Sequence, residues 1–486
     1  MRQSSASQEP SYQTMTEGYR SLLVDNEEAN RGPLPGLEAC FNTSIRPLEK
    51  EAAAQSMDSA GKGVLHSSSV FFGPALLQLA THAACDGEDC SAEDRIYGIR
   101  PSSLLTVANV IATMLAAICL PFLGALVDRS HHRRLAGAST AYILIAINFA
   151  QIFLSSGTWP FFWILHIISD SCNMIHHVII LAYLQNLTGD LNLLSRYTSS
   201  FAAIQFLVMT IYILSITVYA QGTTSDIVVI SRLAHVLSFV FGSVTLTYAW
   251  TNLFGERPPL LRTPSTPIWE RIQQIRRDNP PLMWLLVTVL WSPYVGSGSY
   301  FAIFSTLQKS LVEMTSPQIG IANLLTLLST LAGTRLSNFC CYRWNALRSF
   351  QLCLSTMALT FAGTSLLVHG PGQVHLYYFF SCGLGVTMGW YLPTERVLFC
   401  ALAPSGVEVM GVLLSVHAST SWIPPFLFSV VNEAGYSLGW ALASEIFLFS
   451  IALLCSSRIA MPQKVESSSS VLREEPPSAS ESNQFV

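Results

Sequence analysis

The sequence predicts an all-α, polytopic membrane protein with about twelve transmembrane helices, arranged as two six-helix halves. Three observations carry this prediction. Half of the 486 residues are hydrophobic and only 12% are charged, whereas soluble globular chains carry roughly 25% charged residues. The apolar segments approach the roughly 20 residues that a helix needs to cross a bilayer. The charged residues collect in the two terminal stretches and in short clusters between apolar segments.

The apolar segments define the expected helices. Their approximate ranges are 65–84, 102–127, 136–155, 159–182, 198–220, 227–250, 282–304, 317–336, 346–368, 375–398, 408–430 and 437–457. In lipid the backbone must satisfy its own hydrogen bonds, which leaves only helices or a closed β-barrel. Barrel strands are about 10 residues long and alternate apolar with polar side chains. These segments are longer and do not alternate, so we expect helices.

Composition divides the chain into five parts. Residues 1–62 and 459–486 are polar and lack a sustained hydrophobic period, which predicts disordered cytosolic tails. We expect one six-helix half over 63–250, a cytosolic linker over 251–281, and the other half over 282–458. No apolar core lies near the first residue, so no cleavable signal peptide is expected. Two such halves related by a pseudo-symmetry axis are typical of secondary transporters.

The distribution of Lys and Arg predicts the orientation. With a cytosolic N-terminus, the inner loops hold twelve arginines and the outer loops hold only Arg95, Arg100 and Lys309. Because cytoplasmic loops carry an excess of Lys and Arg, both termini should be cytosolic. The first outer loop also contains Cys85 and Cys90, which flank an acidic stretch and could form a disulfide.

Several functional classes lack their sequence signals. An enzyme is not expected, because there is no His-Glu-x-x-His motif and no pair of aspartates on facing helices. No cofactor or metal site is expected, since no Cys and His spacing of the zinc type occurs. Basic residues form short clusters beside helix ends and no stripe with interleaved aromatics, which argues against nucleic acid as a partner.

The loop after the second apolar segment carries candidate gating residues. They are Gly124, Asp128, Arg129, Arg133 and Arg134. This stretch resembles the signature of the major facilitator superfamily between helices two and three, with its glycine, its Asp-Arg pair and its trailing basic residues. The resemblance implies that these residues gate the two halves and do not bind substrate. His131 departs from it, standing where the family usually has a second glycine. The alternative is that arginines at a cytosolic helix end only set the topology.

The fourth apolar segment has the most unusual polar pattern. His166, Asp170, Asn173 and His177 are spaced by four, three and four residues, which places them on one helical face. Ionisable groups inside a membrane are costly and usually face a cavity or a partner. We therefore expect Asp170 to bind a substrate ammonium or a proton, with the histidines able to couple transport to protons. The alternative is a packed hydrogen-bond network between helices.

The seventh segment adds a polar aromatic patch. Tyr294 and Tyr300 lie there beside Gly296 and Gly298, which loosen the backbone. Broken helices commonly line transporter cavities, so both tyrosines are candidates for substrate binding. Anchoring of aromatic side chains at the membrane interface is the alternative.

A second resemblance covers residues 394–425. This stretch is similar to the segment joining helices ten and eleven in the autophagy-related vacuole effluxer family. The matching residues are Arg396, Leu402, Pro404, Gly406, Glu408, Ser421, Trp422 and Pro425. Pro424 stands where glycine is expected. The stretches GPALLQLA and FAIFSTLQK resemble the first and seventh helices of that family. We add Arg396 and Glu408 to the gating candidates.

The resemblance implies export of amino acids from a vacuole lumen to the cytosol. Neutral amino acids are therefore the first candidate solute and a vacuolar or lysosomal membrane the expected location. Two tyrosine motifs near the N-terminus, beginning at Tyr12 and Tyr19, are similar to lysosomal sorting signals and suggest sorting adaptors as partners. Another small organic solute or a metal complex is the second candidate, because histidines on one face also suit metal. A non-transporting sensor or receptor on the same fold is the other alternative.

Overall fold

A computed structural model gives the architecture. It describes residues 47–85, 94–129, 133–184, 191–223, 226–256, 268–292, 299–402, 413, 416–417 and 419–461. Within these residues the secondary structure is helical, apart from an isolated bridge between Ile96 and Ile99. The elements of the first half are α3 (Pro47–Ser67), α4 (Ser69–Ala84), η2 (Pro101–Ser103), α5 (Leu104–Arg129), α6 (Arg133–Gln151), α7 (Trp159–Leu184), α8 (Leu191–Gln221), α9 (Ile227–Tyr248) and η3 (Ala249–Leu253).

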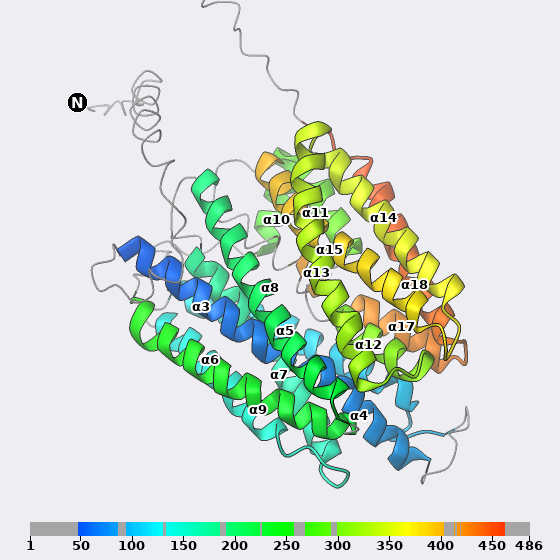
Figure 1. Ribbon diagram of the computed structural model, residues 1–486. Helices are drawn as coiled ribbons and strands as arrows, with labels where there is room; N and C mark the ends of the chain where they lie inside the picture. The colour runs from blue at the N-terminus through cyan, green and yellow to red at the C-terminus, as the bar shows by residue number, and fades with distance from the viewer. Residues whose placement is uncertain are drawn as a thin grey trace, which may run out of the picture.

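The second half begins after a short helix in the linker. That linker helix is α10 (Ile268–Asp278), and the elements of the second half are α11 (Pro280–Trp291), α12 (Ser299–Thr306), η4 (Leu307–Leu311), α13 (Ser316–Arg343), α14 (Ala346–Leu367), α15 (Val374–Leu402), α17 (Ile423–Glu433) and α18 (Leu438–Ser456). In Figure 1, α3, α6, α8 and α9 lie together on one side, and α11, α13, α14 and α18 on the other. The halves touch where α5 packs against α12 and α17, and where α8 packs against α13.

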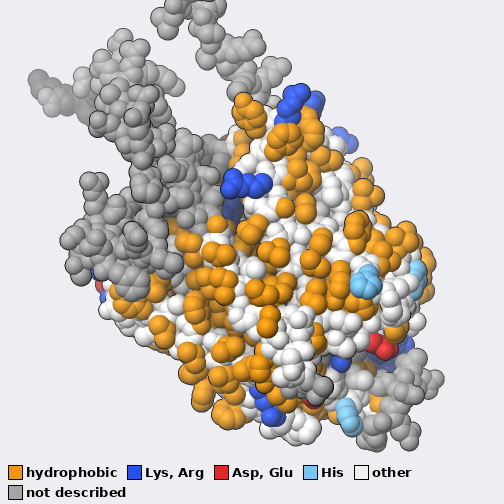
Figure 2. All heavy atoms as spheres, viewed as in Figure 1, with side chains coloured by type: hydrophobic (Ala, Val, Ile, Leu, Met, Phe, Trp, Pro, Cys, Tyr) orange, Lys and Arg blue, Asp and Glu red, His pale blue; other side chains and the backbone are white. Residues whose placement is uncertain are grey.

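The all-α prediction agrees with this architecture. Among the described residues, six helical stretches are long and apolar enough to cross a membrane, namely Pro101–Leu120, Phe201–Gln221, Ile227–Leu253, Ser316–Arg343, Ala346–Leu367 and Leu438–Ser456. Hydrophobic side chains cover much of the face in Figure 2, with few charged ones among them. Leu359, Leu366 and Phe447 are each more than 60% exposed. Such an apolar exterior suits contact with lipid. The count of twelve and the cytosolic termini stay predictions.

The first helix starts earlier than the sequence predicts. Residues 47–62, which we assigned to a disordered tail, form most of α3, and Ala54 and Asp58 are fully buried there. The helix packs against α8 and α9. Its sequence is polar because its polar side chains bond to neighbouring helices and not to water. A hydropathy pattern cannot distinguish such a helix from a tail.

The linker and the first loop each contribute one further feature. Residues Ile268–Asp278 form the short basic helix α10, with Arg276 and Arg277 exposed. Its successor α11 begins at a cap where the backbone N–H of Leu282 donates to Asn279 Oδ1 at 3.2 Å. Cys85, at the end of α4, is disulfide-bonded. Its predicted partner Cys90 lies outside the described residues.

Two helices of the second half cross without side chains between them. A Cβ at Gly389 of α15 would lie 2.8 Å from the carbonyl carbon of Thr330 on α13. A Cβ at Gly333 of α13 would lie 2.9 Å from the carbonyl carbon of Val386 on α15. Small residues let membrane helices approach this closely, so glycines set the contact.

Candidate functional site

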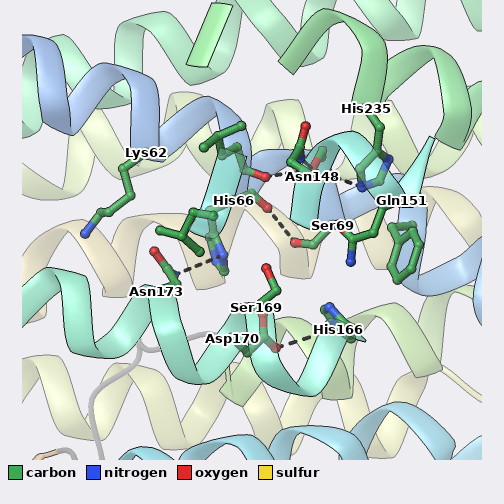
Figure 3. A pocket seen from close by; sticks show the side chains of 14 residues that line it. Lys62, His66, Ser69, Asn148, Gln151, His166, Ser169, Asp170, Asn173 and His235 are labelled. Carbon is green, nitrogen blue, oxygen red and sulfur yellow. Dashed lines mark hydrogen bonds and ion pairs between the residues drawn. The ribbon is translucent and has the colours of Figure 1, made fainter. Parts of the chain in front are cut away.

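The polar face of α7 lines a cavity. His166, Asp170 and Asn173 all contribute to it, together with side chains from α3, α4, α6 and α9 (Figure 3). The space in it that a water-sized molecule can occupy is about 20 Å³, so the cavity is narrow in the state shown. Its other polar side chains are Lys62, His66, Ser68, Ser69, Asn148, Gln151, Ser169 and His235. The sequence therefore located one wall of the cavity, and tertiary packing supplied the others.

Asp170 is the acidic group of this cavity. Its Oδ2 lies 3.6 Å from His166 Nε2, and the two side chains are 18% and 13% exposed. Asn173 Nδ2 lies 3.4 Å from His66 Nδ1. Asp170, His166 and His66 also line a second cavity with Phe301 and neighbouring α12 side chains. Asp170 thus lies between the two halves, where a bound solute would contact both.

Lys62 is the basic group of the same cavity. It lies on α3 and is half-buried, and Nζ contacts His177 Nδ1 at 2.9 Å. No salt bridge from Lys62 to a carboxylate occurs within the described part of the chain. His177, which we predicted beside Asp170, does not line this cavity and bonds to Lys62 instead. The cavity therefore presents one ammonium group and one carboxylate.

Sequence reasoning missed Lys62 because residue 62 was placed in the tail. A usable signal was present, since Asp58, Lys62 and His66 recur every four residues. Residues at that spacing share one face of a helix. Extending the first helix toward the N-terminus would have brought this polar face opposite that of α7.

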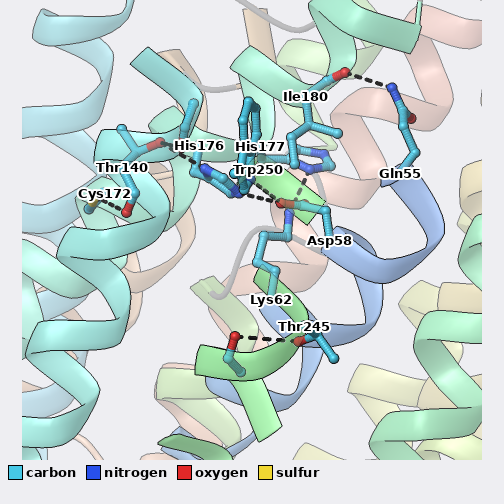
Figure 4. A network of polar contacts seen from close by, with 12 residues as sticks. Gln55, Asp58, Lys62, Thr140, Cys172, His176, His177, Ile180, Thr245 and Trp250 are labelled. Atoms are coloured by element: carbon cyan, nitrogen blue, oxygen red, sulfur yellow. Dashed lines mark hydrogen bonds and ion pairs between the residues drawn. The ribbon is translucent and has the colours of Figure 1, made fainter. Parts of the chain in front are cut away.

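Asp58 anchors a second polar network (Figure 4). Its Oδ1 accepts a hydrogen bond from Trp250 Nε1 at 2.7 Å and lies 3.1 Å from His176 Nε2. His176 Nδ1 lies 2.7 Å from Thr140 Oγ1. The side chains of Asp58 and His176 are fully buried. Through these contacts the network ties α3 to α6, α7 and η3.

The predicted gating loop has two described side chains. Gly124, Asp128 and Arg129 lie in the last turns of α5, and their side chains lie outside the described set. Arg133 is buried at the start of α6. Arg134 Nε donates to the carbonyl oxygen of Trp250 at 2.9 Å. That contact joins α6 to η3 within the first half.

Arg396 is the predicted gating residue that faces the other half. It lies half-buried on α15 and acts electrostatically on His177 of α7, as Lys62 and His417 also do. The preceding residue, Glu395, is buried, with Oε1 2.7 Å from His417 Nε2. Cationic groups from both halves therefore converge on His177. Glu408 and Tyr294 lie outside the described residues.

Tyr300 does not line either cavity. It is 1% exposed and packs against Phe361 and Phe449, with ring centroids 5.3 and 6.3 Å away. Its neighbour Phe301 lines the second cavity and meets the His66 ring edge-on at 5.5 Å. Successive residues of a helix point about 100° apart, so α12 presents Phe301 to the cavity and Tyr300 to the interior of its own half.

The two halves also bond to each other at the end of the bundle where α5 begins. Arg95 Nη1 lies 2.8 Å from Glu433 Oε2, and the backbone N–H of Arg100 donates to Glu433 Oε1 at 2.8 Å. Asn432 Nδ2 donates to Ser103 Oγ at 2.6 Å and to Ser102 Oγ at 2.9 Å. These bonds hold α17 against η2 and the loop before it. By the predicted orientation, this is the side away from the cytosol.

Comparisons with known proteins agree with the fold. Residues 57–203 match the family described as "Vacuole effluxer Atg22 like". No curated protein matches the sequence. A bacterial homologue of the iron transporter ferroportin is similar in its inward-facing state, with a TM-score of 0.59 and 13% identity over 86% of this chain and 99% of that chain. Its outward-facing state gives a TM-score of 0.53 and 13% identity, over 85% of this chain and 99% of that chain.

The human organic anion transporter MFSD10 (TETRAN) gives a TM-score of 0.58 with 14% identity, covering 85% of this chain and all of that chain. The predicted resemblance to the vacuole effluxer family is thus confirmed over residues 57–203, and the solved transporters show that the chain shares their fold.

Proposed function

We propose that this chain is a secondary transporter of neutral amino acids that works by alternating access across a vacuolar or lysosomal membrane. The carrying observation is that Lys62 and Asp170 face one cavity of the first half, while Asp170 also lines a second cavity with α12 side chains of the other half. A neutral amino acid has one ammonium and one carboxylate group, and each charge needs an opposite partner when it leaves water. Asp170 would bind the ammonium group and Lys62 the carboxylate.

The rest of the cavity suits such a solute. Phe72 provides apolar surface, and Asn148 and Gln151 provide hydrogen-bonding groups. An uncharged sugar would offer no opposite charge to either Lys62 or Asp170. A small organic solute of other charge, or a metal complex bound by His66 and His166, is the second candidate.

The surrounding contacts support a sequence of events. Lys62 bonds to His177, and Arg396 of the other half acts on the same histidine. A substrate carboxylate would draw Lys62 away from His177 and change the balance of positive charge between the halves. The bonds of Glu433 and Asn432 at the opposite end would then break as that end opens. Twelve helices, cytosolic termini and the vacuolar location belong to this proposal, supported by the Lys and Arg distribution and the matching family.

Counterflow into liposomes that contain the purified protein tests the proposal. Labelled neutral amino acids should exchange in the wild type, and Asp170→Asn and Lys62→Met should each raise the half-saturating concentration. A charge-assisted hydrogen bond contributes about 1.5–3 kcal/mol, which corresponds to a change of about 10- to 150-fold. Lys50→Met is the matched control, because Lys50 is an exposed lysine on the same helix.

The two substitutions also make opposite predictions for substrate analogues. An amine that lacks the carboxylate should be insensitive to Lys62→Met and still depend on Asp170. If a broad amino-acid panel does not exchange in the wild type, the proposed substrate is wrong. If the panel raises the melting temperature of the protein but none of it crosses the membrane, the chain is a sensor and not a transporter.

A further inference from the structure

Glu445 of α18 is a buried acid without a partner. It is 0% exposed, and neither carboxyl oxygen has a hydrogen-bond partner. The two other buried carboxyl groups among the described residues differ from it. Asp58 pairs with His176, and Glu395 pairs with His417. Glu445 therefore has no polar contact that could stabilise a negative charge.

The surroundings of Glu445 are aromatic. Tyr300 of α12 is the titratable group close enough to act on it electrostatically, and the Tyr300 hydroxyl also has no hydrogen-bond partner. Phe449, one helical turn further along α18, packs against Tyr300 and Phe361. A carboxylate in such surroundings is stable only when it binds a proton or meets a cation.

The other helices packed against α18 offer no counter-charge. Within the described residues, α11 carries no ionisable side chain. On α14, Arg348 lies near the C-terminal end of α18, because Gln351, one turn further along α14, donates to the carbonyl oxygen of Ser456 there. The other ionisable residue of α14, Cys353, bonds to the carbonyl oxygen of Thr387 on α15. On α17, Glu433 is paired with Arg95 across the halves. The group that neutralises Glu445 must therefore come from outside this cluster.

Helix α12 connects Glu445 to the substrate cavity. Its Tyr300 packs against Phe449, one turn along α18 from Glu445, while the adjacent Phe301 lines the second cavity and contacts His66. A movement of α12 that follows substrate binding would displace Tyr300 from Glu445. The carboxyl group would then reach water, where the ionised form is favoured.

We propose that Glu445 is a proton-binding site that couples transport to protons, holding a proton in the state shown and releasing it when α12 moves. The inference rests on the proposed transport function, but the protonation of Glu445 can be tested without transport. The site lies apart from the Asp170 cavity, in the other half of the protein. One proton would bind to one carboxylate oxygen and leave from it in each cycle.

Infrared spectroscopy of the purified protein tests the proton directly. The wild-type spectrum at neutral pH minus that of Glu445→Gln should contain the C=O stretch of one carboxylic acid. Glu256→Gln is the control, since Glu256 is exposed and its replacement should leave the carboxylic acid band unchanged. If the difference spectrum lacks the carboxylic acid band, Glu445 is ionised and the proposal is overturned. This measurement does not depend on the identity of the solute.

Transport in liposomes tests the coupling. With one proton per solute, a gradient of about one pH unit should drive roughly tenfold accumulation in the wild type and in Glu256→Gln. Glu445→Gln should keep counterflow, which also shows that it is folded, and lose the accumulation. If Glu445→Gln accumulates solute as well as the wild type does, the proposed coupling is overturned. It is also overturned if this variant loses counterflow along with accumulation. A response to a sodium gradient in place of the pH gradient would overturn it too. If the wild type exchanges no amino acid, the proposed substrate fails while the infrared result still decides the proton site.

Discussion

The crossing of α13 and α15 gives a prediction that can be worked through from distances. Gly389→Ala would place a Cβ 2.8 Å from the carbonyl carbon and 3.0 Å from the Cα of Thr330. Both are backbone atoms of the facing helix, so no side-chain rotation can relieve the overlap. The helices must therefore separate locally. This would also disturb the next residue of α15, Trp390, whose Nε1 donates a 2.9 Å hydrogen bond to Ser349 Oγ of α14.

The expected loss of stability follows from two opposing terms. Overpacking a close contact costs typically about 1–3 kcal/mol, and a rigid backbone obstacle favours the upper end of that range. Replacing Gly by Ala in a helix gains about 1 kcal/mol. The net loss should therefore be about 2 kcal/mol. For a unit the size of one half, this corresponds to a fall in melting temperature of roughly 4–8 °C.

Thermal unfolding of the purified protein, followed by tryptophan fluorescence, measures this effect. Gly157→Ala is the matched control, because a Cβ at Gly157 meets nothing within 4 Å. The control should melt within the range of the wild type. If Gly389→Ala melts at the wild-type temperature or above it, α13 and α15 do not cross as closely as described, and the reasoning is refuted.

Two further predictions concern the polar contacts. Asp58→Ala leaves His176 and Trp250 without their acceptor. Because breaking a buried pair from one side costs about 3–5 kcal/mol, the yield of folded protein and its melting temperature should both fall. An unchanged melting temperature would contradict the network. Asn432→Ala removes two hydrogen bonds to serines of the other half, at about 0.5–1.5 kcal/mol each, and should favour opening at that end. A maleimide that cannot cross the membrane should then label the introduced thiol about 5- to 150-fold faster in the double variant Thr106→Cys with Asn432→Ala than in Thr106→Cys alone. Equal labelling rates would show that these bonds do not control opening.

Sequence alone determined the class of the protein and one wall of its site. Lipid imposes length and hydropathy on each spanning segment, so these features are local and can be counted along the chain. The polar face of α7 was predictable for the same reason, because ionisable residues stand out in an apolar segment. The α-helical periodicity then placed His166, Asp170 and Asn173 together, and all three line the cavity.

Tertiary structure decided what those residues meet. Helix α3 is polar because its partners are other helices, and only packing distinguishes it from a tail. Lys62 became a candidate once α3 was placed beside α7, and His177 was found to bond to it. Tyr300 and Phe301 are neighbours in sequence, yet only the position of α12 determines which of them faces the cavity. Partners far apart in the chain are set by packing, for which a single sequence carries no local signal.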